Sequence, residues 1–209
     1  MMDDIGSILT RAPVIPVLTI ARIGDAAPLA HALCKGGLTV LEVTLRTDTA
    51  LEAITTIARE VPDAVVGAGT VLAPSDIYRA REAGARFAVS PGLTDSLARA
   101  TALPLLPGVA TASEIMRGKE WGFTHFKFFP AESSGGVAAL KSFAGPFANI
   151  RFCPTGGITA QTAPDYLALP NVLCVGGSWM VPQAMIDGHD WNGITALAQQ
   201  AAALRPPRQ

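Results

Sequence analysis

The sequence predicts an α/β protein built as one (β/α)8 barrel, or TIM barrel, with short loops. Short runs rich in Val, Ile, Leu or Phe alternate with longer Ala-rich segments of helical periodicity. There are eight such units, and strands that alternate with helices pair in parallel through right-handed crossovers. An open, doubly wound sheet is the competing fold, but it typically has fewer units. Hydrophobic residues make up 49% of the 209 residues and charged residues 16%, which suits one large core.

The predicted strands are apolar runs that end in residues typical of turns. The third is followed by Gly69-Thr70 and the fourth by Ser90-Pro91-Gly92, where Gly and Pro favour a change of chain direction. Strand residues alternate between the two faces of a sheet, so each run has an inner and an outer set of side chains. The eight runs are Val14–Thr19, Val40–Leu45, Val65–Ala68, Phe87–Val89, Leu105–Leu106, His125–Phe129, Ile150–Cys153 and Leu173–Val175.

The predicted helices lie between these runs and carry recognisable start and stop residues. Pro28 and Pro74 stand in first turns, where proline is tolerated, and Gly36 and Gly84 stand at helix ends. The helical segments begin near Asp25, Thr49, Ser75, Thr94, Thr111, Gly136, Gln161 and Asn192.

The whole chain, 1–209, is predicted to be one domain without a linker. Residues 1–11 are expected to form a short lead-in helix, and residues 205–209 a tail that two prolines keep out of a helix. Because barrels of this kind typically have about 250 residues, the loops are expected to be short.

Composition excludes several classes of function. The net charge of -1 offers no basic surplus for nucleic acid, and 6% aromatic residues are too few to stack along a single strand. No apolar run approaches the roughly 18 residues of a membrane-spanning helix. The three cysteines are odd in number and none forms a C-x-x-C pair, which predicts free thiols in a reducing cytoplasm. The first residues are acidic, where a signal peptide would be basic.

Lys127 is the first candidate for chemistry, because it lies inside the aromatic run Phe126-Lys127-Phe128-Phe129. Alternation directs Phe126 and Phe128 toward the helices and Lys127 into the barrel. Burial favours the neutral form of an amine, which is a nucleophile toward carbonyl groups. Catalysis through a Schiff base is the functional interpretation, and a structural pair with one carboxylate is the alternative.

The second strand presents a polar face to the same interior. Glu42, Thr44 and Arg46 share one face, whereas parallel barrel strands are usually apolar on both. Glu42 could move protons, and Arg46, nearest the carboxyl end, could hold a substrate carboxylate. A salt bridge within the strand is the alternative, and both interpretations are compatible.

Two glycine pairs predict a phosphate site. Gly156-Gly157 follows the seventh strand, and Gly176-Gly177, with Ser178 directly after it, ends the eighth. The loops after these two strands often bind phosphate through backbone N–H groups, and glycine lets the backbone approach the anion. Ordinary turn glycines are the alternative.

No metal site is expected. His31 lies within a predicted helix, His125 begins a strand at the opposite end of the barrel, and His189 lies near the last helix. These side chains should not converge on one ion. Cys153 is expected to act as a small buried hydrophobic residue.

Five of these motifs, in this order, resemble the 2-keto-3-deoxy-6-phosphogluconate (KDPG) aldolase family, which also cleaves 4-hydroxy-2-oxoglutarate (KHG). The similarity runs from about Ile8 to Pro182. The motifs are Leu41-Glu42-Val43-Thr44-Leu45-Arg46-Thr47, Gly67-Ala68-Gly69-Thr70, Phe126-Lys127-Phe128-Phe129-Pro130-Ala131-Glu132, Arg151-Phe152-Cys153-Pro154-Thr155-Gly156-Gly157 and Gly176-Gly177-Ser178-Trp179.

The resemblance implies a class I aldolase of the Entner–Doudoroff pathway. Such an enzyme is expected to be a cytoplasmic homotrimer that acts on a phosphorylated keto acid and uses no cofactor and no metal. No nucleic-acid or membrane partner is expected. The resemblance assigns the Schiff base to Lys127 and acid/base chemistry through a water to Glu42. After the first strand, Thr19-Ile20-Ala21-Arg22 replaces a more basic stretch of the family, and Arg22 could serve there as a cation near the phosphate. The pyruvyl-binding residues would be Arg46, Thr70, Pro91 and Phe129, and the phosphate-binding residues Gly156, Gly157, Gly177 and Ser178.

Two other functions fit the residues. A metal-free isomerase or epimerase of sugar phosphates could use Glu42 as base and Lys127 as electrostatic stabiliser. An inactive phosphosugar-binding or interaction protein is the second, and the intact set of Lys127, Glu42 and Arg46 argues against it.

Overall fold

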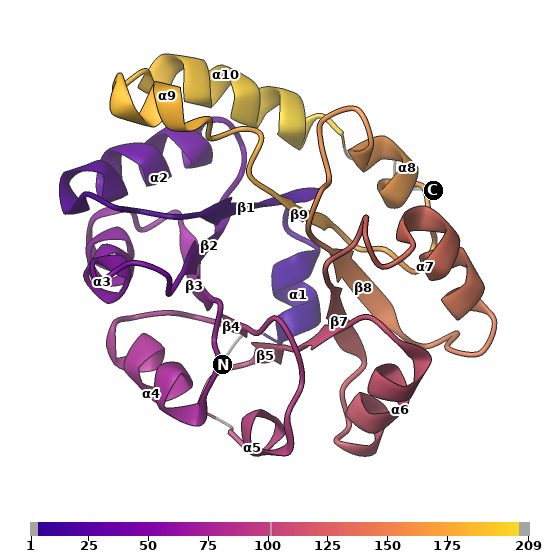
Figure 1. Ribbon diagram of the computed structural model, residues 1–209. Helices are drawn as coiled ribbons and strands as arrows, with labels where there is room; N and C mark the ends of the chain where they lie inside the picture. The colour runs from indigo at the N-terminus through magenta and orange to yellow at the C-terminus, as the bar shows by residue number, and fades with distance from the viewer. Residues whose placement is uncertain (1–3, 101, 205–209) are drawn as a thin grey trace.

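A computed structural model describes residues 4–100 and 102–204. Parallel strands curl around the centre and helices cover their outer side (Figure 1). The strands are β1 (Val14–Leu18), β2 (Val40–Thr44), β3 (Val65–Gly69), β4 (Ala88–Val89), β5 (Leu105–Leu106), β6 (Gly108–Val109), β7 (His125–Phe128), β8 (Arg151–Pro154) and β9 (Val175–Gly177).

The helices follow the strands in alternation, as the sequence predicts, and each predicted start lies within two residues of an observed one. They are α1 (Ile5–Leu9), the 3-10 helix η1 (Ile23–Asp25), α2 (Ala26–Lys35), α3 (Ala50–Glu60), α4 (Pro74–Glu82), α5 (Asp95–Ala98), α6 (Ala112–Glu120), α7 (Gly136–Ala144), α8 (Ala163–Leu167), α9 (Gln183–Asp187) and α10 (Trp191–Ala202).

The strands form two parallel sheets where the sequence predicts one closed ring. The larger sheet has six strands in the order β5-β4-β3-β2-β1-β9, and the smaller has the order β6-β7-β8. The predicted fifth strand, Leu105–Leu106, is β5, and an additional strand, β6, follows it after Pro107, which has no N–H to donate to a ladder. Single parallel bridges join Phe152 to Val172 and Thr155 to Gly176, where β8 approaches the segment of β9.

Alternation sorts the side chains of β7 as expected. Phe126 and Phe128 are fully buried and pack against Phe152 of β8 with ring centroids 6.5 Å apart. Phe143 of α7 meets Phe128 edge to face at 6.1 Å, which ties the helix to the sheet. The outer face of the strands is therefore the layer between sheet and helices, and Lys127 belongs to the inner face.

The short helix α1 packs on the interior of the strands, which agrees with the predicted lead-in helix (Figure 1). Asp4 accepts a hydrogen bond from the N–H of Gly6 at the start of this helix. Its Ile8 and Leu9 join an inner apolar cluster made with Ile15, Val40, Val65, Phe87, Val89, Leu106, Cys153 and Cys174. Residues 1–3 of the predicted lead-in and the predicted tail 205–209 lie outside the described residues.

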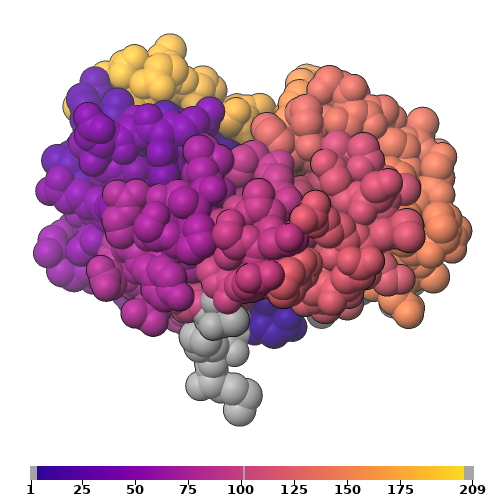
Figure 2. Space-filling model, turned by 60° about the horizontal axis from the view of Figure 1, so that its bottom comes forward, coloured from indigo at the N-terminus to yellow at the C-terminus, as the bar shows by residue number. Residues whose placement is uncertain are grey.

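The helices α2 and α10 lie side by side (Figure 1). The early and late parts of the chain consequently meet on the surface of the molecule (Figure 2). Thr195 of α10 donates its hydroxyl to the carbonyl of Ala32 in α2 at 3.1 Å. A Cβ on Gly36 would overlap Ala198, so glycine permits this close approach. Within the described residues, no helix has the length and apolar character needed to span a membrane.

The three cysteines are free thiols, as predicted. Burial, with a smaller contribution from Asp63, raises the pKa of Cys34 to about 11. A hydrogen bond with Cys153, together with burial, raises the pKa of Cys174 well above its usual value. The raised pKa values keep the Cys34 and Cys174 thiols in the protonated, poorly nucleophilic form.

Candidate active site

Lys127 and Glu42 meet on the inner side of the curled sheets, although they lie on β7 and β2. The Lys127 Nζ donates to Glu42 Oε1 at 3.1 Å. Lys127 is 6% exposed and Glu42 4%, so both charged groups are removed from bulk water. The ammonium also lies 5.2 Å from the centroid of the Phe129 ring. The structure thus brings three sequence-predicted residues into one cluster.

A buried ion pair of this kind contributes little to stability. Desolvation of the two charges offsets their attraction, and apolar residues of the same volume often stabilise a core more. A Lys–Glu pair can instead pass a proton between its members, which leaves a neutral amine beside a carboxylic acid. The arrangement can therefore prepare a nucleophile and then act as acid or base toward what that nucleophile binds.

Gly69 makes room for Glu42 at the end of β3. A Cβ at this position would overlap the Glu42 carboxylate and its Cγ. The Glu42 side chain consequently has its position fixed from two sides, by Lys127 and by the bare backbone of β3.

The Gly69→Ala variant is expected to displace the Glu42 carboxylate and to lower activity by roughly 10²-fold, since a misplacement of about 1 Å can have this effect. Gly145→Ala is the matched control, because a Cβ there meets nothing within 4 Å. Turnover of both variants and their thermal midpoints test this. Equal activity of the two variants would contradict the idea that Gly69 sets the position of Glu42.

Arg46 is held at the mouth of the site by two threonines. Its Nε donates to Thr44 Oγ1 at 3.2 Å and its Nη2 to Thr19 Oγ1 at 2.8 Å. Thr44 is itself anchored, because its hydroxyl donates to the Leu18 carbonyl at 2.9 Å. These bonds orient an exposed guanidinium, whose planar fork suits a carboxylate or a phosphate.

Thr70 and Pro91 follow the carboxyl ends of β3 and β4, at the edge where Phe129 follows β7. Thr70 has a φ of 57°, in the left-handed region that β-branched residues rarely adopt. Such strained residues gather at functional sites. Pro91 lies so close to Gly108 of β6 that a Cβ on this glycine would overlap the Pro91 carbonyl.

The predicted phosphate residues lie in the loops after β8 and β9. Gly156 and Gly157 have φ values of 106° and 79°, which glycine alone adopts without strain. A Cβ on Gly177 would overlap the Trp179 ring, so this backbone is also tightly packed. Ser178 is exposed and lines a groove of about 350 Å³ together with Arg46.

Two polar residues were missed by sequence reasoning. Thr155, which directly precedes the glycine pair, has a buried hydroxyl with no hydrogen-bond partner among the described residues, beside Gly176. Glu132 accepts from the Tyr166 hydroxyl at 2.7 Å and lies over Gly157. Burial, followed by this hydrogen bond, raises the pKa of Tyr166, so its phenol stays a donor. The sequence signal that could have identified Thr155 as a site residue is its position as a polar residue at a strand end, directly before two glycines.

Residues 4–100 and 102–204 contain no group of three His, Cys, Asp or Glu side chains arranged around a metal ion. His125 lies by α1, at the end of the strands away from Arg46, and burial lowers its pKa. His189 pairs instead with Asp25 at 3.4 Å on the rim.

Comparison with known proteins gives consistent results. The family model for KDPG and KHG aldolase matches residues 5–197. The KHG/KDPG aldolase of Escherichia coli strain K12 is 54% identical over 198 residues, which are 93% of this chain and 93% of that protein.

Two solved structures are similar over nearly their full length. KDPG aldolase from Legionella pneumophila, with pyruvate captured as a covalent carbinolamine, has a TM-score of 0.92 and 48% identity, covering 94% of this chain and 97% of that one. The aldolase of Zymomonas mobilis ZM4 with 3-phosphoglycerate has a TM-score of 0.94 and 54% identity, covering 99% of both. The chain belongs to the KDPG and KHG aldolase family.

Proposed function

We propose that this protein cleaves KDPG reversibly to pyruvate and glyceraldehyde 3-phosphate through a Schiff base on Lys127. The observation that carries the proposal is the buried Lys127 Nζ, 3.1 Å from Glu42 Oε1, in a chain of this family. The carbinolamine in the Legionella pneumophila relative supports covalent chemistry with pyruvate. The reaction needs no cofactor, because the iminium nitrogen accepts the electrons of the breaking bond.

The first half of the reaction builds the imine. After Lys127 passes its proton to Glu42, the neutral Nζ attacks the C2 ketone and forms a carbinolamine. Loss of the C2 oxygen as water, with protonation of that oxygen by the nearby carboxylic acid, gives the protonated imine. Arg46 and Thr70 bind the C1 carboxylate, while Pro91 and Phe129 form the apolar walls beside the pyruvyl group.

The second half breaks the carbon–carbon bond. Glu42, acting through a water molecule, removes the C4 hydroxyl proton, the C3–C4 bond breaks and glyceraldehyde 3-phosphate leaves. The bond electrons move into the C2–C3 position and reduce the iminium to a neutral enamine. Protonation of C3 and hydrolysis then release pyruvate and restore Lys127. Proton transfer by a positioned group typically contributes about 10²–10⁴-fold.

We extend the proposal to KHG, which would give pyruvate and glyoxylate. The bond cleaved and the C1 carboxylate are the same, and the E. coli relative carries both substrates in its name. The difference lies at the distal end, where KDPG has a phosphate and KHG a carboxylate. We place this phosphate against the backbone N–H groups of Gly156, Gly157 and Gly177 and the hydroxyl of Ser178. The Zymomonas mobilis relative, solved with 3-phosphoglycerate, supports a phosphate subsite.

Ser178→Ala is expected to separate the two ends of the substrate. Loss of one donor to a charged acceptor costs about 1.5–3 kcal/mol, so kcat/KM for KDPG should fall roughly tenfold or more. KHG cleavage should change much less. Arg46→Ala should impair both substrates, since both present the C1 carboxylate. The measurement is kcat/KM for the two substrates in both variants, and equal losses for Ser178→Ala would remove Ser178 from the phosphate subsite.

We also propose the closed (β/α)8 barrel, the homotrimer and the cytoplasmic location that the family resemblance implies. The bridges Phe152–Val172 and Thr155–Gly176, and a gap of one residue between β5 and β6, support closure of the ring. Leu72 and Met116 are 65% and 57% exposed, which suits a subunit contact. Sedimentation of the purified chain tests the trimer.

A further inference from the structure

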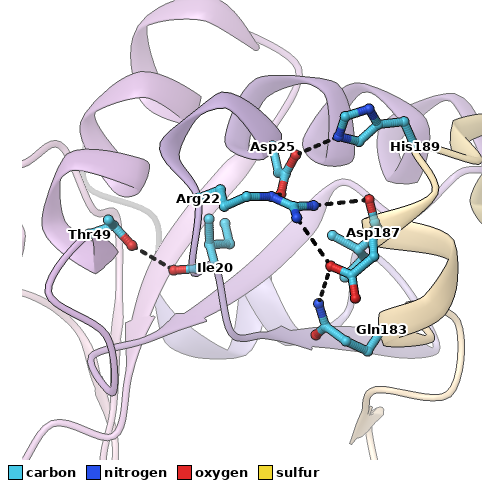
Figure 3. Close-up of polar contacts among 8 residues, drawn as sticks. Ile20, Arg22, Asp25, Thr49, Gln183, Asp187 and His189 are labelled. Atoms are coloured by element: carbon cyan, nitrogen blue, oxygen red, sulfur yellow. Dashed lines mark hydrogen bonds and ion pairs between the residues drawn. The ribbon is translucent and has the colours of Figure 1, made fainter.

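Ion pairs join the segment after β1 to α9 and the turn that follows it, on the rim of the ring (Figure 3). Arg22 Nε lies 2.8 Å from Asp25 Oδ2, and Arg22 Nη1 lies 3.3 Å from Asp187 Oδ1. His189 Nε2 lies 3.4 Å from the other Asp25 oxygen, and Gln183 Nε2 donates to Asp187 at 3.1 Å. We call Arg22, Asp25, Asp187 and His189 the rim clamp.

Asp25 is the centre of the clamp because its side chain is only 8% exposed. A buried carboxylate requires compensating partners, and here one comes from its own segment and one from beyond α9. His189 reaches it from a φ of 52°, and its ring stacks on Trp191 at 5.5 Å. The strained backbone of His189 is thus held by contacts on both sides.

The two segments that the clamp joins both contribute lining residues to the groove that contains Arg46 and Ser178, although the four clamp residues themselves lie outside its lining. One segment carries Thr19, which holds Arg46 at 2.8 Å. The other carries Ser178, followed by Gln183 and Ile186, and the Ile186 carbonyl accepts from Arg22 Nη2 at 3.4 Å. The clamp therefore joins, outside the groove, the two segments of the chain that line it.

We propose that the rim clamp is a positioning device that fixes this groove for the phosphorylated end of the substrate. The inference rests on the proposed function, which places that end beside Ser178. KDPG has six carbons and a terminal phosphate and reaches the rim, whereas KHG has five carbons and ends nearer the reacting bond. Arg22 is committed to two carboxylates, so it ties the two segments together rather than serving as the cation that binds phosphate.

Arg22→Gln tests the clamp, with Arg79→Gln as its matched control. Both arginines form pairs with an aspartate three residues away at 2.8 Å, and they are 52% and 59% exposed. Arg22→Gln is expected to lower kcat/KM for KDPG roughly ten- to hundredfold, mainly through KM, as small displacements at a binding site do. KHG cleavage and borohydride trapping of pyruvate should stay within about twofold of the parent, because Thr44 of β2, outside the clamp, still holds Arg46 at 3.2 Å. Every property of Arg79→Gln should also stay within about twofold.

Two further variants separate positioning from loss of structure. Arg22→Lys should recover only part of the KDPG activity, because an ammonium cannot bridge two carboxylates as a guanidinium does. His189→Gly suits the positive φ and removes only the contacts with Asp25 and Trp191, so a smaller loss of the same selectivity is expected.

The ratio of kcat/KM for KDPG to that for KHG decides the result. If Arg22→Gln has the same ratio as the parent protein, the proposed role of the rim clamp is wrong, and this holds for any result with Ser178→Ala. An unchanged ratio in Ser178→Ala alone would remove Ser178 from the phosphate subsite, while a selective loss in Arg22→Gln would still support the clamp.

Discussion

Lys127→Met is expected to lower kcat for KDPG by more than roughly 10⁴-fold, since loss of a covalent nucleophile removes the reaction path itself. Methionine has a similar length and can occupy the same buried space without a nucleophilic nitrogen. The carbinolamine, the imine and the enamine all require a bond to Nζ, so none of them can form. The measurement is the rate of pyruvate release, followed at saturating KDPG.

Two controls separate chemistry from stability in this variant. Lys127→Met leaves Glu42 buried without its partner, which costs about 3–5 kcal/mol. The double variant Lys127→Met/Glu42→Gln removes the unpaired charge and should regain stability but no activity. Lys141→Met changes an exposed lysine at the end of α7 and should be fully active. Turnover by Lys127→Met within tenfold of the parent would exclude a Schiff base at this residue.

Glu42→Gln is expected to lower kcat on the order of 10²–10⁴-fold, because an amide of the same shape cannot take a proton. The amide oxygen can still accept from Lys127, so the fold and the site geometry should persist. The step most affected is removal of the C4 hydroxyl proton. Glu42 also serves imine formation, so trapping of pyruvate should become slower, but the final yield of reduced imine after long incubation, which needs no cleavage, should fall far less than kcat.

The comparison of turnover with trapping in Glu42→Gln distinguishes two roles for this residue. A large loss of kcat with a preserved final yield of trapping assigns Glu42 to proton transfer in cleavage. Near-normal turnover would reduce Glu42 to a structural partner of Lys127, and the proton transfer would then have to be assigned to another group.

The alternation of strands and helices could be predicted because helix starts and buried strands have strong local sequence patterns. Thr111, for example, caps α6 with its hydroxyl, and Glu114 accepts from the Thr111 N–H, so the start is encoded in four residues. The strand β6 and the helix α9 were not predicted. Gly108–Val109 is too short to show alternation, and a helix of five residues is too short to show a repeated helical pattern.

The inner cluster was predictable from alternation alone. Lys127 stands between two core phenylalanines, and Glu42 stands between Leu41 and Val43, so each had to face away from the apolar layer. That the two side chains touch was not predictable, because β2 and β7 belong to different sheets and 85 residues separate them.

The rim clamp could not be predicted from the sequence either, because its residues lie far apart along the chain. Arg22 and Asp25 look like an ordinary surface pair at helical spacing, and Asp187 and His189 lie more than 160 residues further along the chain. Only the fold brings these side chains together. Thr155 was missed because a threonine before two glycines also reads as turn chemistry.

The most direct measurement is borohydride reduction in the presence of pyruvate, followed by mass mapping of the peptides. The predicted result is one reduced pyruvyl group on Lys127, with activity lost in proportion to labelling. No label on Lys35, Lys119 or Lys141 is expected, since each lies outside the inner cluster. Labelling of one of those three lysines, or no labelling at all, would contradict the Schiff base on Lys127 and would favour a sugar-phosphate isomerase that uses Glu42 as its base.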